Sequence, residues 1–248
     1  MLDLVLPTVC EECRARSVYR ARTADDAPAH IPRVLCATCV GRLSFMENPG
    51  CTHCQRKLAT SQAPRRCTAC MRERTALGSC TAQVAFTGNA EKWIHAFKYP
   101  HQGIAGLDPA PIAIAKALAR DAAQTSPAPF PDVVVPVPLH VRRLRSRGFN
   151  PASQLARAIA KQTTSGLVTD LLLRHRDTPT QTNLGRNARR KNVRGAFSCT
   201  RNAPDNVWLV DDVVTTGSTL EEAARCLKAA GAKSVHAICI ARTPERFR

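Results

Sequence analysis

Two adjacent carboxylates followed by a run of hydroxyl groups give this sequence its most specific chemical signal. Asp211 and Asp212 come directly after the apolar stretch 207–210, and a helical pattern begins at Leu220. The segment in between ends in Thr215, Thr216, Gly217, Ser218 and Thr219. Carboxylates suit sugar hydroxyls or Mg²⁺, whereas hydroxyls, backbone amides and a helix N-terminus suit a phosphate. The order therefore predicts a ligand that carries both a sugar diol and a phosphate.

A second candidate site comes from the spacing of the cysteines near the N-terminus. Eight of the twelve cysteines form four Cys-x-x-Cys pairs, and two such pairs complete a tetrahedral zinc site. Used in chain order, the pairs predict two sites: Cys10, Cys13, Cys36 and Cys39, then Cys51, Cys54, Cys67 and Cys70. Pairing of the first pair with the third is an alternative. Because large apolar residues are few there, we expect the two zinc ions to supply most of the folding free energy of residues 1–75.

The rest of the chain alternates between short apolar strands and amphipathic helices. We expect strands at 81–87, 132–137, 171–174, 207–210 and 234–241, and helices at 90–99, 109–124, 152–162 and 220–230. The basic stretch 142–150 is expected to be a loop. Strands that alternate with helices indicate an α/β fold with a parallel sheet. We therefore expect two domains, a double zinc-ribbon module with four-cysteine sites over residues 1–75 and an α/β domain over residues 81–248.

Residues 210–220 resemble the phosphoribosyl-pyrophosphate (PRPP) signature of type I phosphoribosyltransferases. Other segments narrow the resemblance to the ComF family: 97–99 (Phe-Lys-Tyr), 135–139 (Val-Pro-Val-Pro-Leu), 147–150 (Arg-Gly-Phe-Asn), and 181–189 with Asn192, Ala196 and Phe197. An amino-terminal cysteine region also belongs to that family. These segments cover nearly the whole chain in the expected order. The resemblance implies a parallel-sheet type I phosphoribosyltransferase-like domain with a small N-terminal double zinc ribbon.

The resemblance also implies roles for particular residues. Asp211 and Asp212 are expected to bind the ribose and the Mg²⁺ that accompanies PRPP. The 5′-phosphate is assigned to Val213, Val214, Thr215, Thr216, Gly217, Ser218 and Thr219, and the pyrophosphate to a turn and cationic lid of Val137, Pro138, Leu139, Arg143 and Arg147. Pro100 and His101 depart from the family pattern, so Lys98 is credited only with the position that suits a cation at a helix C-terminus. No catalytic residue is identified.

The formal net charge of +17 points to a polyanionic partner. The candidates are nucleic acid and PRPP itself, and we assign nucleic-acid contacts to Arg142, Arg145, Arg189, Arg190 and Lys191. Aromatic residues make up only 4% of the chain, which argues against a wide base-stacking platform. The sequence has neither a run of roughly 20 apolar residues nor a signal-peptide pattern, so we expect a cytoplasmic protein.

Three functions fit these features. The first is PRPP binding with Mg²⁺. The second is the handling of single-stranded DNA, because proteins similar to ComF are implicated in natural transformation at the cytoplasmic side of the membrane. The third is a zinc-stabilised adaptor with a vestigial pocket that docks a helicase or an uptake component. We expect the first two together, in a protein that reaches the inner face of the membrane through partners. An active, amidophosphoribosyltransferase-like enzyme of nucleotide metabolism is the alternative.

Overall fold

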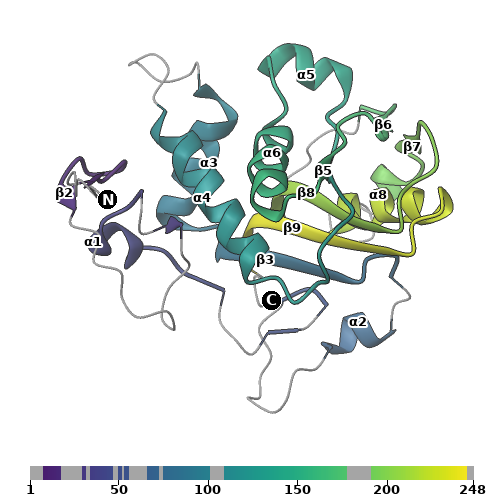
Figure 1. The fold of residues 1–248 in the computed structure, drawn as a ribbon, viewed down its shortest axis with the longest axis horizontal. Helices are drawn as coiled ribbons and strands as arrows, with labels where there is room; N and C mark the ends of the chain where they lie inside the picture. The colour runs from purple at the N-terminus through teal and green to yellow at the C-terminus, as the bar shows by residue number, and fades with distance from the viewer. Residues whose placement is uncertain are drawn as a thin grey trace.

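A parallel five-stranded sheet forms the centre of the molecule, with the strand order β3, β9, β8, β4, β5 (Figure 1). The strands are β3 (Ser79–Ala85), β4 (Val133–Pro136), β5 (Gly166–Leu167), β8 (Asn206–Val214) and β9 (Ser234–Arg242). The computed structural model describes residues 8–17, 30–31, 34–46, 50–51, 53–55, 66–72, 75–100, 109–177 and 191–244. The predicted parallel-sheet α/β fold is therefore confirmed.

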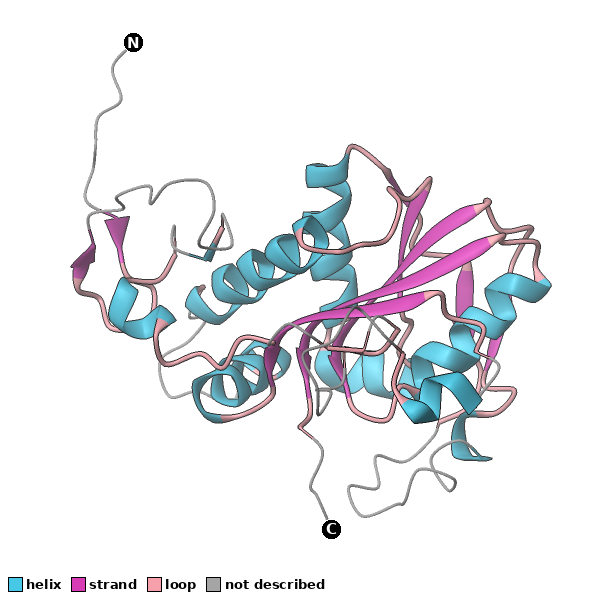
Figure 2. Ribbon diagram, turned by 90° about the horizontal axis from the view of Figure 1, so that it is seen from below, coloured by secondary structure: helices cyan, strands magenta, loops and turns pink. Residues whose placement is uncertain are grey.

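Helices cover both faces of the sheet, as Figure 2 shows. One face carries α3 (Gly88–Lys98), α4 (Ala110–Gln124) and α6 (Pro151–Thr163); the other carries α8 (Ser218–Ala229) and the antiparallel pair β6 (Leu172–Arg174) and β7 (Phe197–Cys199). Strands buried on both faces are continuous apolar runs, and the valines of β4 and β8 supply such runs. Apart from a few residues at the ends, these helices lie where the sequence places them.

Strand β8 is longer than predicted. The apolar pattern indicates a strand that ends at Val210, but the ladder between β8 and β9 continues to the pair Val214–Arg242. Asp211 and Asp212 are thus part of the strand, not of the loop that follows. The apolar pattern misses this extension because backbone pairing with β9 continues beyond the last apolar side chain of the run.

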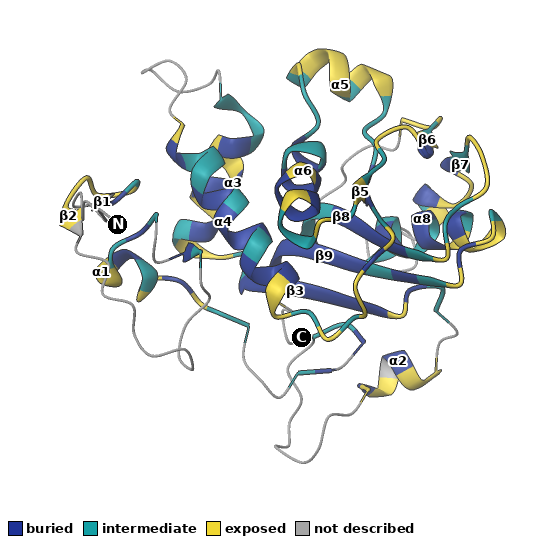
Figure 3. Cartoon of the chain, viewed as in Figure 1, coloured by how far each residue is buried: buried dark blue, intermediate teal, exposed yellow. Residues whose placement is uncertain are grey.

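The basic stretch after β4 is a helix, so the prediction of a loop over 142–150 is wrong. Helix α5 (Val141–Arg147) begins at His140, whose side chain accepts a hydrogen bond from the backbone N–H of Arg142, 3.4 Å away. It ends at Gly148, where a φ of 81° suits glycine. None of its residues is buried (Figure 3). Because α5 lacks an apolar stripe, hydrophobic periodicity cannot reveal it.

The first cysteine group packs on the side of the core that α3, α4 and α6 cover. It lies near β1 (Thr8–Val9), β2 (Arg16–Ser17) and α1 (Ala37–Val40). Its buried members Cys10 and Cys39 belong to the same apolar cluster as Trp93 on α3. The buried carboxylate of Asp121 on α4 accepts backbone hydrogen bonds from His30 (2.8 Å) and Ile31 (2.9 Å). This part of the chain is therefore tied directly to the α/β core.

The second cysteine group, with α2 (Thr68–Arg72), lies at another part of the core, beside the edge strand β3 (Figure 1). The backbone N–H of Cys80 donates to the carbonyl oxygen of His53 at 2.7 Å, and that of Ala85 donates to Ser44 at 2.7 Å. An uncovered edge strand can pair with another chain, so the cysteine-rich segment protects β3. In the described part of the chain, no helix is both long and apolar enough to cross a membrane.

Substitution of Asp121 by asparagine should destabilise the protein. The amide keeps the side-chain volume but loses one acceptor and places an NH₂ group against a backbone N–H. We expect the free energy of unfolding of Asp121→Asn to fall by about 2–3 kcal/mol, measured by urea unfolding of the zinc-loaded chain. The exposed Asp170→Asn should unfold at nearly the wild-type urea concentration. Equal stability of Asp121→Asn and wild type would contradict this anchoring role.

Candidate functional site

The predicted carboxylates meet a lysine at the end of β8. The Nζ atom of Lys98, on α3, lies 2.8 Å from Oδ1 of Asp212, and both side chains are mostly buried. The backbone N–H of Asp212 donates to Oδ1 of Asp211 at 2.9 Å. The carboxylate of Asp212 is therefore held next to a cation that comes from a helix more than one hundred residues earlier in the sequence.

The segment around Lys98 also contacts the predicted lid. Nη2 of Arg147 donates to the Tyr99 hydroxyl at 2.9 Å, and the Arg147 guanidinium lies 4.7 Å from the centroid of the Tyr99 ring. The sequence analysis assigned Lys98 no role at the site, only a position that suits a cation at the end of a helix. The Phe-Lys-Tyr segment, which carries part of the family resemblance, was the signal that could have placed Lys98 at the site. The structure connects this segment both to the carboxylates and to α5.

Burial and the neighbouring charges together set the protonation of Asp211. Burial, and next the neighbouring Asp212 carboxylate, raise the pKa of Asp211 from an ordinary value of 3.8 to about 7, although Lys98 and Arg174 act in the opposite direction. Arg174 lies at the end of β6, where its guanidinium is 5.5 Å from the centroid of the Phe197 ring. Its proximity to the site was not expected from the sequence, because β6 and β8 belong to different sheets.

The predicted phosphate-binding residues lie in two structural settings. Val213 and Val214 are still part of β8, and Val214 is buried. Gly217 caps the N-terminus of α8 with a φ of 78°, and the Thr216 and Ser218 hydroxyls lie 2.9 Å apart. The Ser218 backbone N–H donates to the Thr216 hydroxyl at 3.4 Å. Because Gly217 has no side chain to cap α8, the next amides, those of Thr219 and Leu220, and the helix dipole are available to an anion.

Helix α5 separates the predicted arginines into two groups. Arg143 and Arg147, one helical turn apart, are half-buried, whereas Arg142 and Arg145 are exposed. Before the helix, the predicted pyrophosphate turn of Val137, Pro138 and Leu139 lies beside β8: the Val137 backbone N–H donates to Val210 at 2.8 Å, and its carbonyl oxygen accepts a bond from Asn150 at 2.9 Å.

The second basic cluster is largely beyond the part of the chain that the structure describes. Arg189 and Arg190 lie outside the described residues, as do residues 181–188 of the family resemblance. Lys191 is described and exposed. The nucleic-acid assignment of Arg189 and Arg190 therefore remains a prediction from the sequence.

Each predicted cysteine set has the geometry of a zinc site. Within both sets the four Sγ atoms lie within 4.8 Å of one another. The Sγ–Sγ distance is 3.6 Å between Cys13 and Cys36, and 3.8 Å between Cys54 and Cys67. A tetrahedral zinc ion with Zn–S bonds of about 2.3 Å places its sulfurs about 3.8 Å apart. Both sets can hold zinc, in the chain-order pairing, and the interleaved alternative is wrong.

The raised pKa of Asp211 should make stability depend on pH. Between about pH 4 and pH 7 the folded chain binds more protons at Asp211 than the unfolded chain does. The contribution of this group to the free energy of unfolding therefore decreases as the pH rises through that range. We expect Asp211→Asn to lose this decrease and to be more stable than wild type above pH 7, by urea unfolding at constant ionic strength. Asp170→Asn should keep the wild-type trend. A wild-type trend in Asp211→Asn would mean that the decrease has another origin.

The zinc sites should load independently of each other. We expect close to two zinc ions per wild-type chain and close to one in both Cys13→Ser and Cys70→Ser, measured by elemental analysis under reducing conditions. The control is Cys226→Ser, since Cys226 belongs to neither set, and it should retain two ions. A wild-type value near zero would remove the zinc assignment.

The sequence pattern of a known domain family matches most of the α/β region. Residues 112–247 match the family described as phosphoribosyl transferase domain. The matched segment spans more than half of the chain and includes β4, α5, β8 and α8, the elements that carry the carboxylates, the predicted lid and the phosphate loop.

Among individual proteins, one relative is similar over most of the chain and others over about half of it. Competence protein F of Haemophilus influenzae is 26% identical over 222 residues, which cover 84% of this chain and 96% of that protein. The DNA utilization protein YhgH of Salmonella typhi is 38% identical over 116 residues, and competence protein ComFC of Bacillus subtilis is 31% identical over 140 residues. The aligned regions span 51% and 54% of those two proteins, or about half of their lengths.

Among solved structures, the glutamine PRPP amidotransferase of B. subtilis in complex with ADP and GMP is similar to part of this chain. The identity is 24%, the TM-score is 0.38, and the similarity covers 57% of this chain and 29% of the enzyme. A purine phosphoribosyltransferase from Pyrococcus horikoshii has 21% identity and a TM-score of 0.32, and the similarity covers 53% of this chain and 72% of that protein.

Proposed function

This chain belongs to the phosphoribosyl transferase domain family and to the ComF family, and we propose that it binds PRPP with Mg²⁺ and handles single-stranded DNA during DNA uptake. The proposal that the ligand is PRPP is supported above all by the Asp211–Asp212 pair on β8, which lies shortly before the glycine-capped N-terminus of α8. Carboxylate oxygens suit ribose hydroxyls and Mg²⁺, and the helix N-terminus suits the 5′-phosphate.

The donor atoms at the site fit a divalent cation. The Asp212 carboxylate already forms an ion pair with the Lys98 ammonium group, 2.8 Å away, so this position stabilises a cation. With ligand bound, Asp211 and Asp212 would hold the ribose and Mg²⁺, and the cation would neutralise part of the negative charge of the phosphates. Lys98 would then be free to turn from Asp212 toward the pyrophosphate, beside Arg143 and Arg147 of α5. The proposal concerns binding of the ligand, not its conversion.

The DNA part of the proposal rests on charge and on relatives. The relatives are named as competence and DNA utilization proteins, and the chain carries a net charge of +17. Arg142 and Arg145 are exposed on α5, whereas Arg143 and Arg147 of the same helix are half-buried. Cations on an open surface bind a phosphate backbone without sequence preference. We place the protein in the cytoplasm, at the inner face of the membrane through uptake partners such as a helicase.

Titration calorimetry with PRPP and Mg²⁺ tests the ligand. We expect saturable binding to the zinc-loaded wild-type chain and at least a tenfold weaker affinity for the double variant Asp211→Asn/Asp212→Asn, since the two side chains assigned to the ribose and Mg²⁺ can no longer become negatively charged. Asp170→Asn removes a carboxylate far from β8 in sequence and should bind as wild type does. If the wild-type chain does not bind PRPP at millimolar concentration, the proposal of PRPP binding is refuted, and the zinc-stabilised adaptor remains as the alternative function.

Salt dependence tests the DNA surface. With a fluorescent single-stranded oligonucleotide, the logarithm of the association constant should fall linearly with the logarithm of salt concentration. Neutralising two phosphate contacts in Arg142→Gln/Arg145→Gln should reduce that slope by about 1.4, at roughly 0.7 per contact. Arg201→Gln removes an exposed arginine that pairs with Asp170 and should leave the slope unchanged. If the α5 variant also keeps the wild-type slope, α5 is not the DNA surface.

A further inference from the structure

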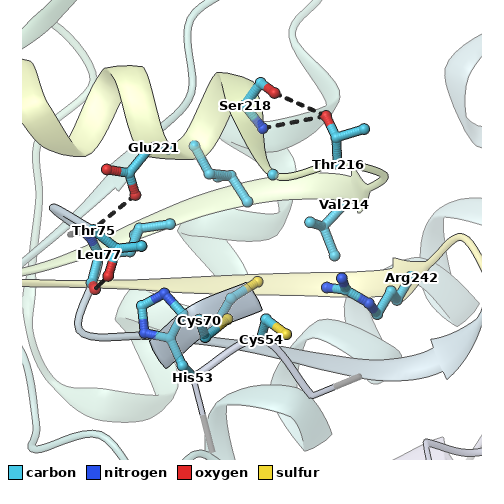
Figure 4. A pocket seen from close by; sticks show the side chains of 13 residues that line it. His53, Cys54, Cys70, Thr75, Leu77, Val214, Thr216, Ser218, Glu221 and Arg242 are labelled. Atoms are coloured by element: carbon cyan, nitrogen blue, oxygen red, sulfur yellow. Dashed lines mark hydrogen bonds between the residues drawn. The ribbon is translucent and has the colours of Figure 1, made fainter. Parts of the chain in front are cut away.

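A small cavity lies between the phosphate loop and the second cysteine group (Figure 4). Its volume is about 70 Å³, and its lining comes from three parts of the chain that are distant in sequence. The loop contributes Thr216, Gly217 and Ser218, β9 contributes Arg242, and the cysteine-rich segment contributes Cys54 and Cys70. The space admits a few water molecules or one small oxyanion, but no sugar or base.

Arg242 is the unusual member of this lining. Its side chain is buried, with only 7% of the residue exposed, and its guanidinium points toward the cavity (Figure 4). Within the described residues, no carboxylate forms an ion pair with it and no acceptor takes a hydrogen bond from its guanidinium. A guanidinium has five N–H donors and stays charged, and burying such a charge without an acceptor is costly. An ionisable group that the structure does bring near it is the buried Cys80 thiol, whose pKa is lowered first by a hydrogen bond with Cys239 and also by Arg242. Because no described acceptor takes a hydrogen bond from the guanidinium, its N–H donors can still bind an anion that enters the cavity.

The backbone holds Arg242 firmly at this place. Arg242 is the last residue of β9 and pairs with Ala85 of β3 on one side and with Val214 of β8 on the other. Its carbonyl oxygen accepts a bond from the Phe86 backbone N–H at 2.7 Å. Because Val214 directly precedes the phosphate loop, this register places the guanidinium beside the loop.

The loop supplies the remaining donors for an anion. The Thr219 and Leu220 amides at the start of α8 have no partner within the helix. The Ser218 amide donates to the Thr216 hydroxyl at 3.4 Å, and the Thr216 and Ser218 hydroxyls line the cavity. Glu221 is the acidic residue in the same wall, and its carboxylate accepts backbone hydrogen bonds from Ala76 (2.7 Å) and Leu77 (3.4 Å). The Glu221 carboxylate is therefore already hydrogen-bonded to the segment that follows the second cysteine group.

The second cysteine group closes the opposite side. Cys54 and Cys70 are two of its four thiols, and His53 next to them is fixed by the bond from Nδ1 to the Gly78 carbonyl (3.0 Å). The Glu221 contacts tie α8 to the residues that follow this group. A zinc ion held by the four thiols would keep this wall in place, and loss of the metal would release it.

We propose that this cavity binds the 5′-phosphate of the phosphoribosyl ligand, with Arg242 as its counter-charge and the zinc-loaded second cysteine group as its wall. The inference rests on the proposed PRPP binding and adds two features to it, a buried arginine from β9 and a metal site that closes the subsite. Ligand affinity and zinc retention are then coupled, and the coupling is reciprocal: phosphate in the cavity slows the loss of zinc, and loss of zinc weakens binding.

Calorimetry with PRPP and Mg²⁺ on zinc-loaded chains tests the role of Arg242. We expect Arg242→Met to weaken binding at least tenfold, and Arg242→Lys, which keeps the charge but loses the planar donors, to weaken it several-fold. Arg201→Met is the matched control and should bind as wild type does. Zinc content and cooperative unfolding confirm the fold of each variant; if Arg242→Met does not fold, Arg242→Lys provides the comparison. Wild-type affinity in a folded Arg242 variant overturns the inference and leaves PRPP binding intact.

Zinc release provides a readout that does not need PRPP. In a Cys13→Ser background, where only the second group is complete, transfer of zinc to a chromogenic chelator is followed with and without inorganic phosphate. We expect saturating phosphate to slow transfer at least threefold, and Arg242→Met, or Arg242→Lys if the former does not fold, to remove most of this protection. If wild type binds no PRPP but phosphate protects in an Arg242-dependent way, the proposed function fails and the anion site stands. Release that phosphate does not change overturns the coupling.

Discussion

The register between β8 and β9 is the constraint on which the site depends. The two strands stay paired from Asn206–Ser234 to Val214–Arg242, beyond the apolar run that begins β8. One constant register thus sets where along the sheet the carboxylates lie, where the predicted phosphate loop starts and where Arg242 lies. A shift of one residue would reverse the direction of every side chain, and these groups would no longer lie at the same edge of the sheet.

The carboxylates are stable only because other elements bring cations to them. Burial of Asp211, and next its repulsion by Asp212, disfavour the charged form, and together they raise the pKa of Asp211. Lys98 comes from α3 and Arg174 from β6, on opposite faces of the sheet. Arg147 links the end of α3 to α5 through the Tyr99 hydroxyl. Such a balance of buried charges is typical of functional sites.

The cysteine groups are parts of the α/β structure as much as a separate module. The first packs in the main apolar cluster and is anchored by Asp121, while the second covers the edge of β3 and borders the phosphate loop. A segment with so few large apolar residues cannot order itself by burial alone. Metal ligation would supply that order, and the core would then use the ordered segment as an edge cover and as a wall.

The sequence by itself determined those features of the protein that depend on residues close together in the chain. Alternating apolar runs and amphipathic stretches predict the parallel α/β fold, and Cys-x-x-Cys spacing predicts two metal sites. The order of the apolar run, Asp211, Asp212 and Gly217 predicts a strand, a loop and a helix at the candidate site, although β8 continues to Val214. Tertiary structure alone decided what surrounds that site. Lys98, Arg174 and Arg242 reach it from three other elements, and α5 is a helix without an apolar stripe. Periodicity reports the environment along one element, whereas contacts between elements depend on how the sheet brings its edges and faces together.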